Sequence, residues 1–361
     1  MYDKTDRWLK SMIYSMTNAA DCNEIMAYRL ETSGTLTFIM AYETGGKGTG
    51  TQTVDPLMSQ GSIVLSDDGR FLFVVNAGSS SISSFKITNS GSLILTDVKY
   101  SGGFFPVSIA THCDLLYVAN RGDGDSIPSN LTGFEVDKNG ILTEITNSTK
   151  PLSSSSSNPT CIVFNYESRK VAVSEVNTNF ISVYTIQSDG TLIGPVVNNS
   201  SGAGPFGSVF LTNKVLLVTE AGAKALSSYA VNNDGTLSVL SASVLNNQTA
   251  TCWVSVSQNN HFAYTSNAGG HTITTYEIEY NGHLRVSNII YSTSDGNGAP
   301  IDSEICSNHL YVLNGNEGTI SDFQVSPLGK LILSQVFKDT RLPNLGSQGL
   351  AILCLTPDCK C

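Results

Sequence analysis

The stretch LFVVNAGSSSISSFKITNSGSL, residues 72–93, recurs along the chain in recognisable form. Further copies are VAVSEVNTNFISVYTIQSDGTL at 171–192, LLVTEAGAKALSSYAVNNDGTL at 216–237 and LYVLNGNEGTISDFQVSPLGKL at 310–331. Each copy contains a short apolar run, an Asn or Glu, a loop, an alternating run, and a glycine turn with a leucine two residues later. Because self-similarity of this kind indicates a repeat architecture, it decides the fold before any single motif does.

The turn glycines give the number of copies. Their spacing is about 45 to 57 residues, which is typical of propeller blades. Glycine suits these turns because it adopts the positive φ that tight hairpins need. The chain therefore contains seven repeats, whose turn glycines are Gly34, Gly91, Gly140, Gly190, Gly235, Gly282 and Gly329.

Each repeat contains four strand signals. Residues 205–243 illustrate them with the runs GSVFL, VLLVTE, LSSYAV and LSVLSAS. Alternation with period two and β-branched residues favour strands, and apolar stripes with a helical period are nearly absent. The sequence predicts an all-β fold, a seven-bladed β-propeller with four antiparallel strands per blade.

The two ends of the chain complete one blade. SMIYSMTNAA, residues 11–20, aligns with the second strand of a repeat, and GSQGLAILCL, residues 346–355, aligns with a first strand. We expect one blade closed by N- and C-terminal strands, which removes two free sheet edges. The predicted organisation is an N-terminal extension (1–10), a single propeller domain (11–355) and a cysteine-containing tail (356–361).

Composition excludes several classes of partner. A net charge of −10 with only 14% charged residues argues against nucleic-acid binding. No apolar run approaches the roughly 18 residues that span a bilayer, so we expect no membrane partner. The start MYDKTDRWLKSMIYSMTN lacks the apolar core of a secretory signal, which predicts a cytoplasmic protein, or an extracellular one if the N-terminus is incomplete.

The cysteines show no metal-binding spacing. Cys113, Cys161, Cys252 and Cys306 lie far apart, and we expect them to be free buried thiols. The tail CLTPDCKC, residues 354–361, could form a local disulfide in an oxidising compartment.

The phrases GSIVLSDDGRFLFVVNAGSSSISSFKI, residues 61–87, and SGAGPFGSVF with LLVTEAG, residues 201–222, resemble the lactonase propellers. That family includes a bacterial 6-phosphogluconolactonase and the fungal carboxymuconate lactonising enzyme, and the resemblance covers all seven repeats. It implies a hydrolase or cycloisomerase that acts, without a cofactor, on a small lactone of a sugar acid or related acid. One fold hosts many functions, so it marks the fold more strongly than the substrate.

The sequence departs from the family at the expected active site. The resemblance places that site on the face that carries the loops between second and third strands, here called the mouth face. Relatives have Gly-Pro-Arg-His and Pro-His in two loops entering first strands, whereas this chain has GPFG, with Phe206 and Gly207, and NPTC, with Thr160. The alternative function is therefore a non-catalytic propeller that binds a small ligand or a protein at the mouth. Whether the protein is an enzyme stays open.

Candidate site residues follow from the strand order. The bases that could activate water are Glu220 and Glu175; His271 is a weaker candidate, included because it is the only histidine expected on the mouth face. Arg121 would polarise a carbonyl or hold a carboxylate. Candidate substrate-binding residues are Gln60, Asn76, Asn120, Phe206, Lys224, Trp253, Asp302 and Gln348. The structural alternative is that the Asn and Glu side chains cap second-to-third turns and that Trp253 packs within a blade.

Two further features of the sequence could bind a ligand. GGKGTG, residues 45–50, lacks Gly-Lys-Ser/Thr and no helix follows it, so a phosphate loop is not expected. It is predicted to be an insertion in a mouth-side loop, as a lid, a pocket wall or a structural crossing. Asparagines and glutamates at equivalent positions of the blades form an oxygen-rich ring that could suit a hard cation. Its members are Asn18, Asn76, Asn120, Asn267, Asn314, Glu175 and Glu220. We nevertheless expect no metal, and expect these glutamates to meet Arg121, Lys224 or backbone amides.

Overall fold

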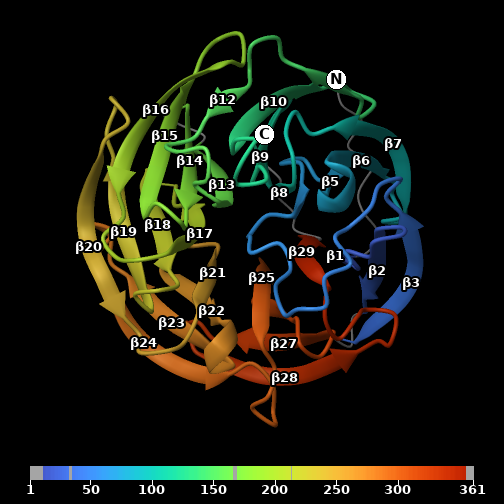
Figure 1. Ribbon diagram of the computed structural model, residues 1–361. Coiled ribbons are helices and arrows are strands. Elements are labelled where there is room, and N and C mark those ends of the chain that lie inside the picture. Colours follow the sequence, from blue (N-terminus) through green and yellow to red (C-terminus); the bar gives the residue numbers. More distant parts are fainter. Residues whose placement is uncertain (1–10, 32–34, 166–168, 213, 355–361) are drawn as a thin grey trace, which may run out of the picture.

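The computed structural model describes residues 11–31, 35–165, 169–212 and 214–354. Within these residues the chain forms seven antiparallel sheets arranged in a ring (Figure 1). This confirms the predicted all-β seven-bladed propeller. The expected extension (1–10) and tail (356–361) lie outside the described residues.

We number the blades in chain order and give their strands from the inner to the outer edge. Blade 1 contains β29 (Gln348–Leu353), β1 (Met12–Met16), β2 (Glu24–Leu30) and β3 (Leu36–Glu43). Blade 2 contains β4 (Ile63–Leu65), β5 (Phe71–Asn76), β6 (Ser81–Ile87) and β7 (Leu93–Tyr100), with the 3-10 turn η1 (Ala77–Ser79) after β5. Blade 3 contains β8 (Pro106–His112), β9 (Leu115–Asn120), β10 (Asn130–Val136) and two short outer strands, β11 (Leu142–Glu144) and β12 (Lys150–Pro151).

The other four blades repeat the same order. Blade 4 contains β13 (Pro159–Asn165), β14 (Lys170–Glu175), β15 (Phe180–Ile186) and β16 (Leu192–Asn199). Blade 5 contains β17 (Pro205–Phe210), β18 (Val215–Glu220), β19 (Ala225–Val231) and β20 (Leu237–Leu245). Blade 6 contains β21 (Thr251–Val256), β22 (Phe262–Asn267), β23 (Thr272–Ile278) and β24 (Leu284–Tyr291), with η2 (Ala268–Gly270) after β22. Blade 7 contains β25 (Pro300–Cys306), β26 (His309–Asn314), β27 (Thr319–Val325) and β28 (Leu331–Lys338).

Ring closure occurs as the sequence predicts. The C-terminal strand β29 pairs antiparallel with the N-terminal strand β1, with Met12 opposite Leu353 and Tyr14 opposite Ala351. One blade is thus built from both ends of the chain, and β1 has a hydrogen-bonded strand on each side.

The turn glycines join neighbouring blades. The carbonyl oxygen of Gly91 in blade 2 accepts a hydrogen bond from the Tyr14 hydroxyl of blade 1 at 2.7 Å, and that of Gly329 accepts one from Tyr264 of blade 6 at 3.2 Å. Every turn glycine in the described part of the chain accepts such a bond from the preceding blade. The remaining pairs are Thr96 to Gly140, Tyr117 to Gly190, Asn198 to Gly235 and Ser228 to Gly282.

The turn glycines also have no room for a side chain. All six have positive φ, between 75° and 89°. A Cβ at Gly329 would lie 2.3 Å from the Phe262 ring of blade 6. Close contact between blades thus explains why the repeat keeps glycine here, in addition to the turn geometry. Gly34 lies outside the described residues.

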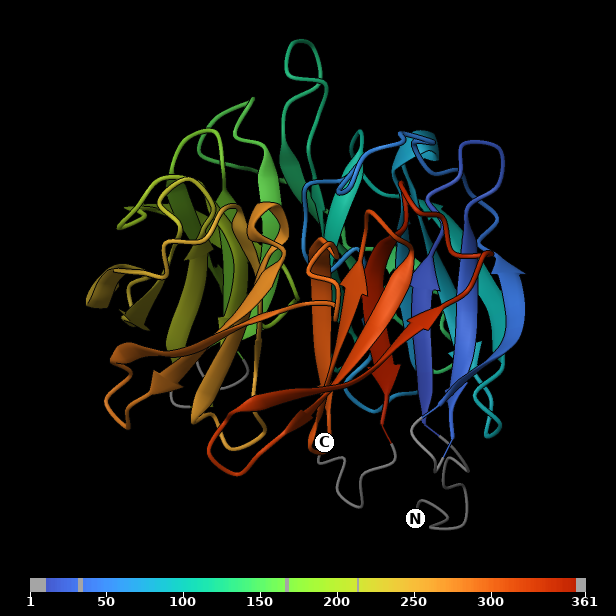
Figure 2. The same cartoon turned by 90° about the horizontal axis from the view of Figure 1, so that it is seen from below.

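The mouth face and the opposite face differ in their loops. Figure 2 shows the long β9–β10 loop, residues 121–129, rising above the mouth face.

In the described part of the chain, no helix has the length and apolar character needed to cross a membrane.

The cysteine prediction was wrong for Cys306 and Cys113. Cys306, at the end of β25, forms a disulfide with Cys354, directly after β29. These inner strands of blades 7 and 1 end side by side, which brings the two Cα atoms within 5.6 Å. Cys113 is exposed, because it lies in the β8–β9 turn, whereas Cys161 and Cys252 are buried thiols as expected.

We predict that Gly329→Ala destabilises the protein more than Gly124→Ala. Both glycines have positive φ, so both variants strain the backbone, but a Cβ at Gly124 has no neighbour within 4 Å. Overpacking against Phe262 should add about 1–3 kcal/mol to the loss at Gly329. Urea unfolding of the two variants measures the difference, and equal losses would contradict the proposed packing role.

Candidate functional site

The inner strands of the blades surround a central channel. Its cavity has a volume of about 270 Å³ and is lined by residues of β4, β8, β13, β17, β25 and β29. Most of the lining is apolar, and its carboxyl groups are those of Asp67, Asp302 and Glu304. None of the described residues that line the cavity is a lysine or an arginine.

Gln60 closes the channel at the mouth end. Its Oε1 accepts from the Val254 amide at 3.0 Å, and its Nε2 donates to the Val254 carbonyl at 3.1 Å. Its own amide donates to Thr160 O at 2.9 Å, and its carbonyl accepts from Ser108 Oγ at 2.6 Å. One residue therefore connects blades 3, 4 and 6, and Figure 1 shows the blue segment after β3 running to the centre of the ring.

The residues before Gln60 are anchored in the same way. We call residues 55–60 the axial segment. The Ser59 carbonyl accepts from Trp253 Nε1 at 3.0 Å and from Gln348 Nε2 at 3.3 Å. The structure thus brings three predicted binding residues, Gln60, Trp253 and Gln348, together around the mouth end of the channel, where each holds the chain's own backbone.

Arg121 holds the outer side of the axial segment. Its guanidinium donates to the Leu57 carbonyl and lies 4.6 Å from the centre of the Phe105 ring. Burial lowers the pKa of Arg121 to about 10, opposed by the nearby Asp55 charge. Burial also raises the pKa of Asp55 to about 7, opposed by a Gln348 hydrogen bond and by Arg121.

The glycine-rich loop, residues 45–50, has its amides occupied. Lys47 N donates to Ser79 Oγ, Gly48 N to Ala19 O, and both Thr49 N and Gly50 N donate to Asn18 oxygens, all at 2.8–2.9 Å. A phosphate would need these amides. The loop is therefore a structural crossing that carries the chain toward the axial segment.

The predicted ring of asparagines and glutamates is buried. Five of its side chains contact the residue seven positions later on the third strand of the same blade. These pairs are Asn76–Ser83, Glu175–Ser182, Glu220–Ser227, Asn267–Thr274 and Asn314–Ser321. The ring side chains thus fasten second-to-third hairpins, while Asn120 donates to Ser101 O and Asn130 Oδ1.

The two glutamates are enclosed by hydrogen-bond donors. Glu220 accepts from Ser243 Oγ at 2.6 Å and from the Gly202 amide at 2.8 Å, and Glu175 accepts from the Ser153 hydroxyl and amide. The expected backbone amides are therefore partners of both. Among the described residues, neither glutamate forms an ion pair with Arg121 or Lys224.

Three further predicted site residues, Phe206, Lys224 and His271, do not line the channel cavity. Phe206 and Trp253 are buried and pack edge to face with ring centres 5.2 Å apart, so they form no open apolar shelf. Lys224 is exposed on the β18–β19 loop. His271, after η2, has its Nδ1 3.2 Å from the Gly298 carbonyl.

The channel contains a pair of neighbouring carboxyl groups. Asp302 and Glu304 are two residues apart on β25 and both line the cavity. Asp302 is buried and accepts hydrogen bonds from the Ser303 and Leu350 amides at 2.9 and 3.2 Å. Burial, with a contribution from the Glu304 charge, raises the pKa of Asp302 well above its usual value.

Glu304 is exposed to solvent in the channel, yet the protein packed around the channel disfavours its charged form and raises its pKa to about 7. Sequence reasoning had found Asp302 but missed Glu304. The available signal was that the equivalent position, four residues after the proline that opens a first strand, is Ala110, Val163 or Val209 in other blades.

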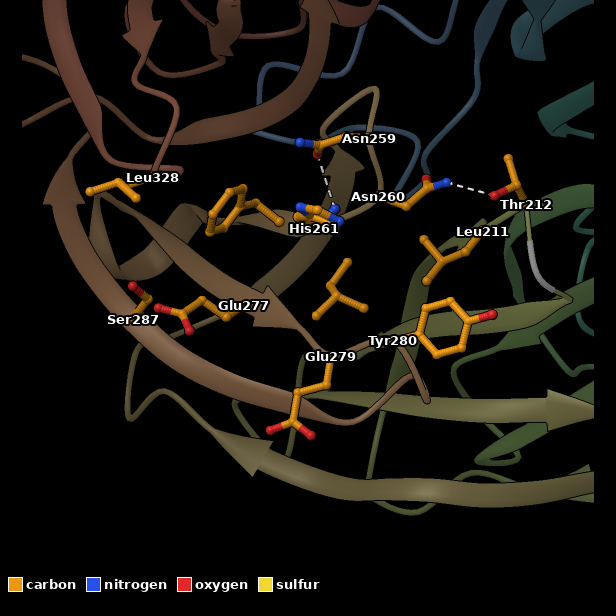
Figure 3. Close-up of a pocket in the computed structure, with 12 residues that line it drawn as sticks. Leu211, Thr212, Asn259, Asn260, His261, Glu277, Glu279, Tyr280, Ser287 and Leu328 are labelled. Carbon is orange, nitrogen blue, oxygen red and sulfur yellow. Dashed lines mark hydrogen bonds between the residues drawn. The ribbon is translucent and has the colours of Figure 1, made fainter.

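A larger hollow lies outside the channel, between turns of blades 5, 6 and 7. It has a volume of about 810 Å³ and is lined by residues that include His261, Glu277, Glu279 and Tyr280 (Figure 3). Glu277 is paired with Arg285, Glu279 is exposed and Tyr280 is fully exposed. Its polar groups do not converge on one point, so the channel is the stronger candidate site.

Comparison with known proteins agrees with this architecture. Residues 23–114 match the family model described as lactonase, 7-bladed beta-propeller. This stretch, which runs from β2 to β8, is similar to the lactonase seven-bladed β-propeller family. No curated protein matches the chain.

Three solved structures with this fold are similar over nearly the whole chain. A Lactobacillus plantarum protein is 17% identical over 95% of this chain and 99% of its own, with a TM-score of 0.76. A 6-phosphogluconolactonase candidate from Bacteroides fragilis is 16% identical over 98% and 100%, with a TM-score of 0.76. The periplasmic gluconolactonase of Pseudomonas aeruginosa is 15% identical over 96% and 100%, with a TM-score of 0.73.

We predict that Gln60→Ala destabilises the propeller by about 1–3 kcal/mol, because the Val254 amide and carbonyl lose their partners at a buried position. Gln52→Ala is the matched control, since Gln52 is exposed in the same loop and makes one long bond, 3.5 Å, to Gly50 O. Urea unfolding compares them. Equal stability of the two variants would contradict the account of Gln60.

We predict a pH dependence of stability that Glu304→Gln reduces. The folded state raises the pKa of Glu304 from 4.5 to about 7, so it favours the protonated form. This contribution to stability is therefore present at low pH and is lost as the pH rises through about 7. Unfolding free energies across this window should fall less steeply for Glu304→Gln than for wild type or for the exposed-site variant Glu279→Gln; parallel curves would contradict the shift.

Proposed function

We propose that the protein hydrolyses a small uncharged lactone in the central channel, with Glu304 as the general base. The observation that carries this proposal is the Asp302–Glu304 pair in a cavity without lysine or arginine among its described lining residues. A general base works best when its pKa lies near the working pH, and the pKa of Glu304 is about 7.

The two carboxyl groups suit different steps of lactone opening. Ionised Glu304 takes a proton from water, and the water oxygen attacks the lactone carbonyl carbon. Burial raises the pKa of Asp302 and so favours its protonated form, and in that form it donates a hydrogen bond to the oxygen that gains charge. The ring C–O bond then breaks, the ring oxygen leaves as a hydroxyl group, and the product is a hydroxy acid.

Charge selects among lactones. A phosphate or carboxylate on the substrate would lie near ionised Glu304 in a cavity without lysine or arginine among its described lining residues, so the two negative charges would repel. The hydroxy-acid product would be repelled by the same carboxylate, which favours its release. The name of the Pseudomonas aeruginosa neighbour, a gluconolactonase, fits an uncharged substrate better than a phosphorylated one.

Size and access narrow the substrate further. A cavity of about 270 Å³ lies just below the range of about 300–1,000 Å³ that is usual for ligand pockets, so it suits a single small ring. Gln60 closes the mouth end, so the substrate would enter from the opposite face, where Leu65, Phe164 and Phe210 line the channel near the ends of their strands. In this proposal three predicted catalytic residues stabilise the fold and take no part in the reaction: Glu175, Glu220 and Arg121.

The test is the rate of glucono-δ-lactone opening above the buffer rate, measured over a range of pH. We expect the rate to rise through pH of about 7, and Glu304→Gln to lower it at least about 100-fold. Asp302→Asn should lower it as well, Glu279→Gln should leave it unchanged, and a phosphorylated lactone should react more slowly. An unchanged rate in Glu304→Gln would refute the assignment.

A second candidate function is ligand binding without chemistry. It is favoured by Phe206, which replaces a family polar residue and is buried within the fold. A lactone or sugar acid that raises the melting temperature of the wild type, with no ring opening above buffer for several lactones, would favour this candidate over hydrolysis.

A further inference from the structure

A carboxylate, an imidazole and a thiol lie side by side on the face opposite the mouth. Asp67 lies in the β4–β5 turn, His112 ends β8, and Cys113 follows it in the β8–β9 turn. His112 Nδ1 lies 2.8 Å from Asp67 Oδ2, and His112 Nε2 lies 3.6 Å from Cys113 Sγ. The order is carboxylate, imidazole, thiol.

The carboxylate fixes the orientation of the other two groups. Asp67 Oδ2 also accepts the Cys113 backbone amide at 3.1 Å, so one oxygen holds both neighbouring residues. With Nδ1–H donated to Asp67, the Nε2 lone pair faces the thiol and can take its proton. A nucleophile, a base and a group that orients the base form the arrangement that activates cysteine thiols.

We propose that Cys113 is an activated nucleophile and a site of covalent modification by small disulfides. His112 Nε2 takes the thiol proton, and the thiolate sulfur attacks one sulfur of the disulfide. A new S–S bond to Cys113 forms as the disulfide's own S–S bond breaks, and the leaving thiolate takes the bond electrons and a proton. No further oxidant is needed, since the disulfide is reduced as Cys113 is oxidised.

The surroundings give this thiol access and a charge preference. Cys113 is exposed and lines a hollow of about 800 Å³. The charged groups that line the hollow are Asp67, Asp68, Arg70, Asp114, Asp137 and Lys138. Asp68 is paired with Arg70, which leaves three carboxylates facing one lysine beside the imidazole. This balance favours neutral or cationic disulfides over anionic ones.

Other chemistries fit the cluster less well. The three ligand atoms lie within 4.8 Å of one another, but Asp67 Oδ2 already holds His112 Nδ1. That leaves two protein ligands at the centre, whereas zinc sites use three or four. The chain offers an internal comparison in His309, whose Nδ1 lies 2.7 Å from Asp322 Oδ1 in the same kind of pair, at the start of β26.

The experiment measures the alkylation rate of Cys113 by iodoacetamide between pH of about 5 and 9, with peptide mass mapping to separate it from other cysteines. A cysteine without activation gives a midpoint near pH 8.5, and one beside a histidine gives about 3.5–7.5. We expect a wild-type midpoint below about 7.5, a return toward 8.5 in His112→Ala, and a smaller shift in Asp67→Asn.

The controls separate activation from mere exposure. His309→Ala should leave the midpoint unchanged, and Cys113→Ser should abolish labelling of that peptide. Cystamine, a cationic disulfide, should react with Cys113 faster than the dianionic 5,5′-dithiobis(2-nitrobenzoate). Added salt screens charge and should bring the ratio of the two rate constants closer to its value for an uncharged environment. Circular dichroism checks that each variant is folded.

Three results would overturn the proposal. The first is a wild-type alkylation midpoint near pH 8.5. The second is a midpoint that does not change in folded His112→Ala or His112→Gln. The third is stoichiometric zinc binding that blocks labelling of Cys113. The cluster lies outside the Asp302–Glu304 pair, so loss of lactone opening in Glu304→Gln should leave Cys113 labelling unchanged, and the two proposals are tested separately.

Discussion

The hydrogen bond from one blade to the turn glycine of the next, made at all six turn glycines that the structure describes, is the contact on which the ring depends. The glycine carbonyl can accept it because the blades lie close together, and they lie close because the glycine has no side chain. At Gly329 both conditions meet, since Tyr264 reaches its carbonyl and the Phe262 ring occupies the space that a Cβ would need. Repeated around the chain, this contact holds consecutive blades at a similar spacing, and the pairing of β29 with β1 completes the ring.

A closed ring brings the inner strands together around one axis, and the axial segment fills the mouth end. Gln60 bonds to blades that are far apart in the sequence, so it acts as an internal brace. The closed end leaves a channel in which Asp302 is buried and Glu304 is exposed to solvent. The protein around these two carboxyl groups disfavours their charged forms and raises both pKa values. The same fold that encloses Glu175 and Glu220 in hydrogen-bond donors thus leaves Glu304 able to exchange a proton near pH 7.

The fold could be predicted from the sequence because the repeat is periodic and its signals are local. Glycine turns, alternating strands and the complementary ends each predict structure without knowledge of distant contacts. The capping role of Asn76 and its equivalents was also accessible, since the partner lies seven residues along the same hairpin. The disulfide between Cys306 and Cys354 was not, because the two cysteines meet only after the last strand joins the first blade.

The candidate site was harder to predict, for a physical reason. Strand order predicts Gln60, Trp253 and Gln348 as mouth residues, but their side chains hold backbone groups of the axial segment and of β21, and the sequence does not specify the path of that segment. Glu304 draws its chemistry from enclosure by five other strands, which no local pattern encodes. The thiol cluster at Cys113 likewise combines two turns that are 45 residues apart.

The central functional claim is that the channel shifts the titration of Glu304. Carbon-13 NMR of the side-chain carboxyl carbons, with the Glu304 signal assigned by its loss in Glu304→Gln, measures this pKa directly. The account predicts a midpoint near 7, and a shift of that midpoint when an uncharged lactone analogue occupies the channel. A midpoint near 4.5, unaffected by the analogue, would contradict it.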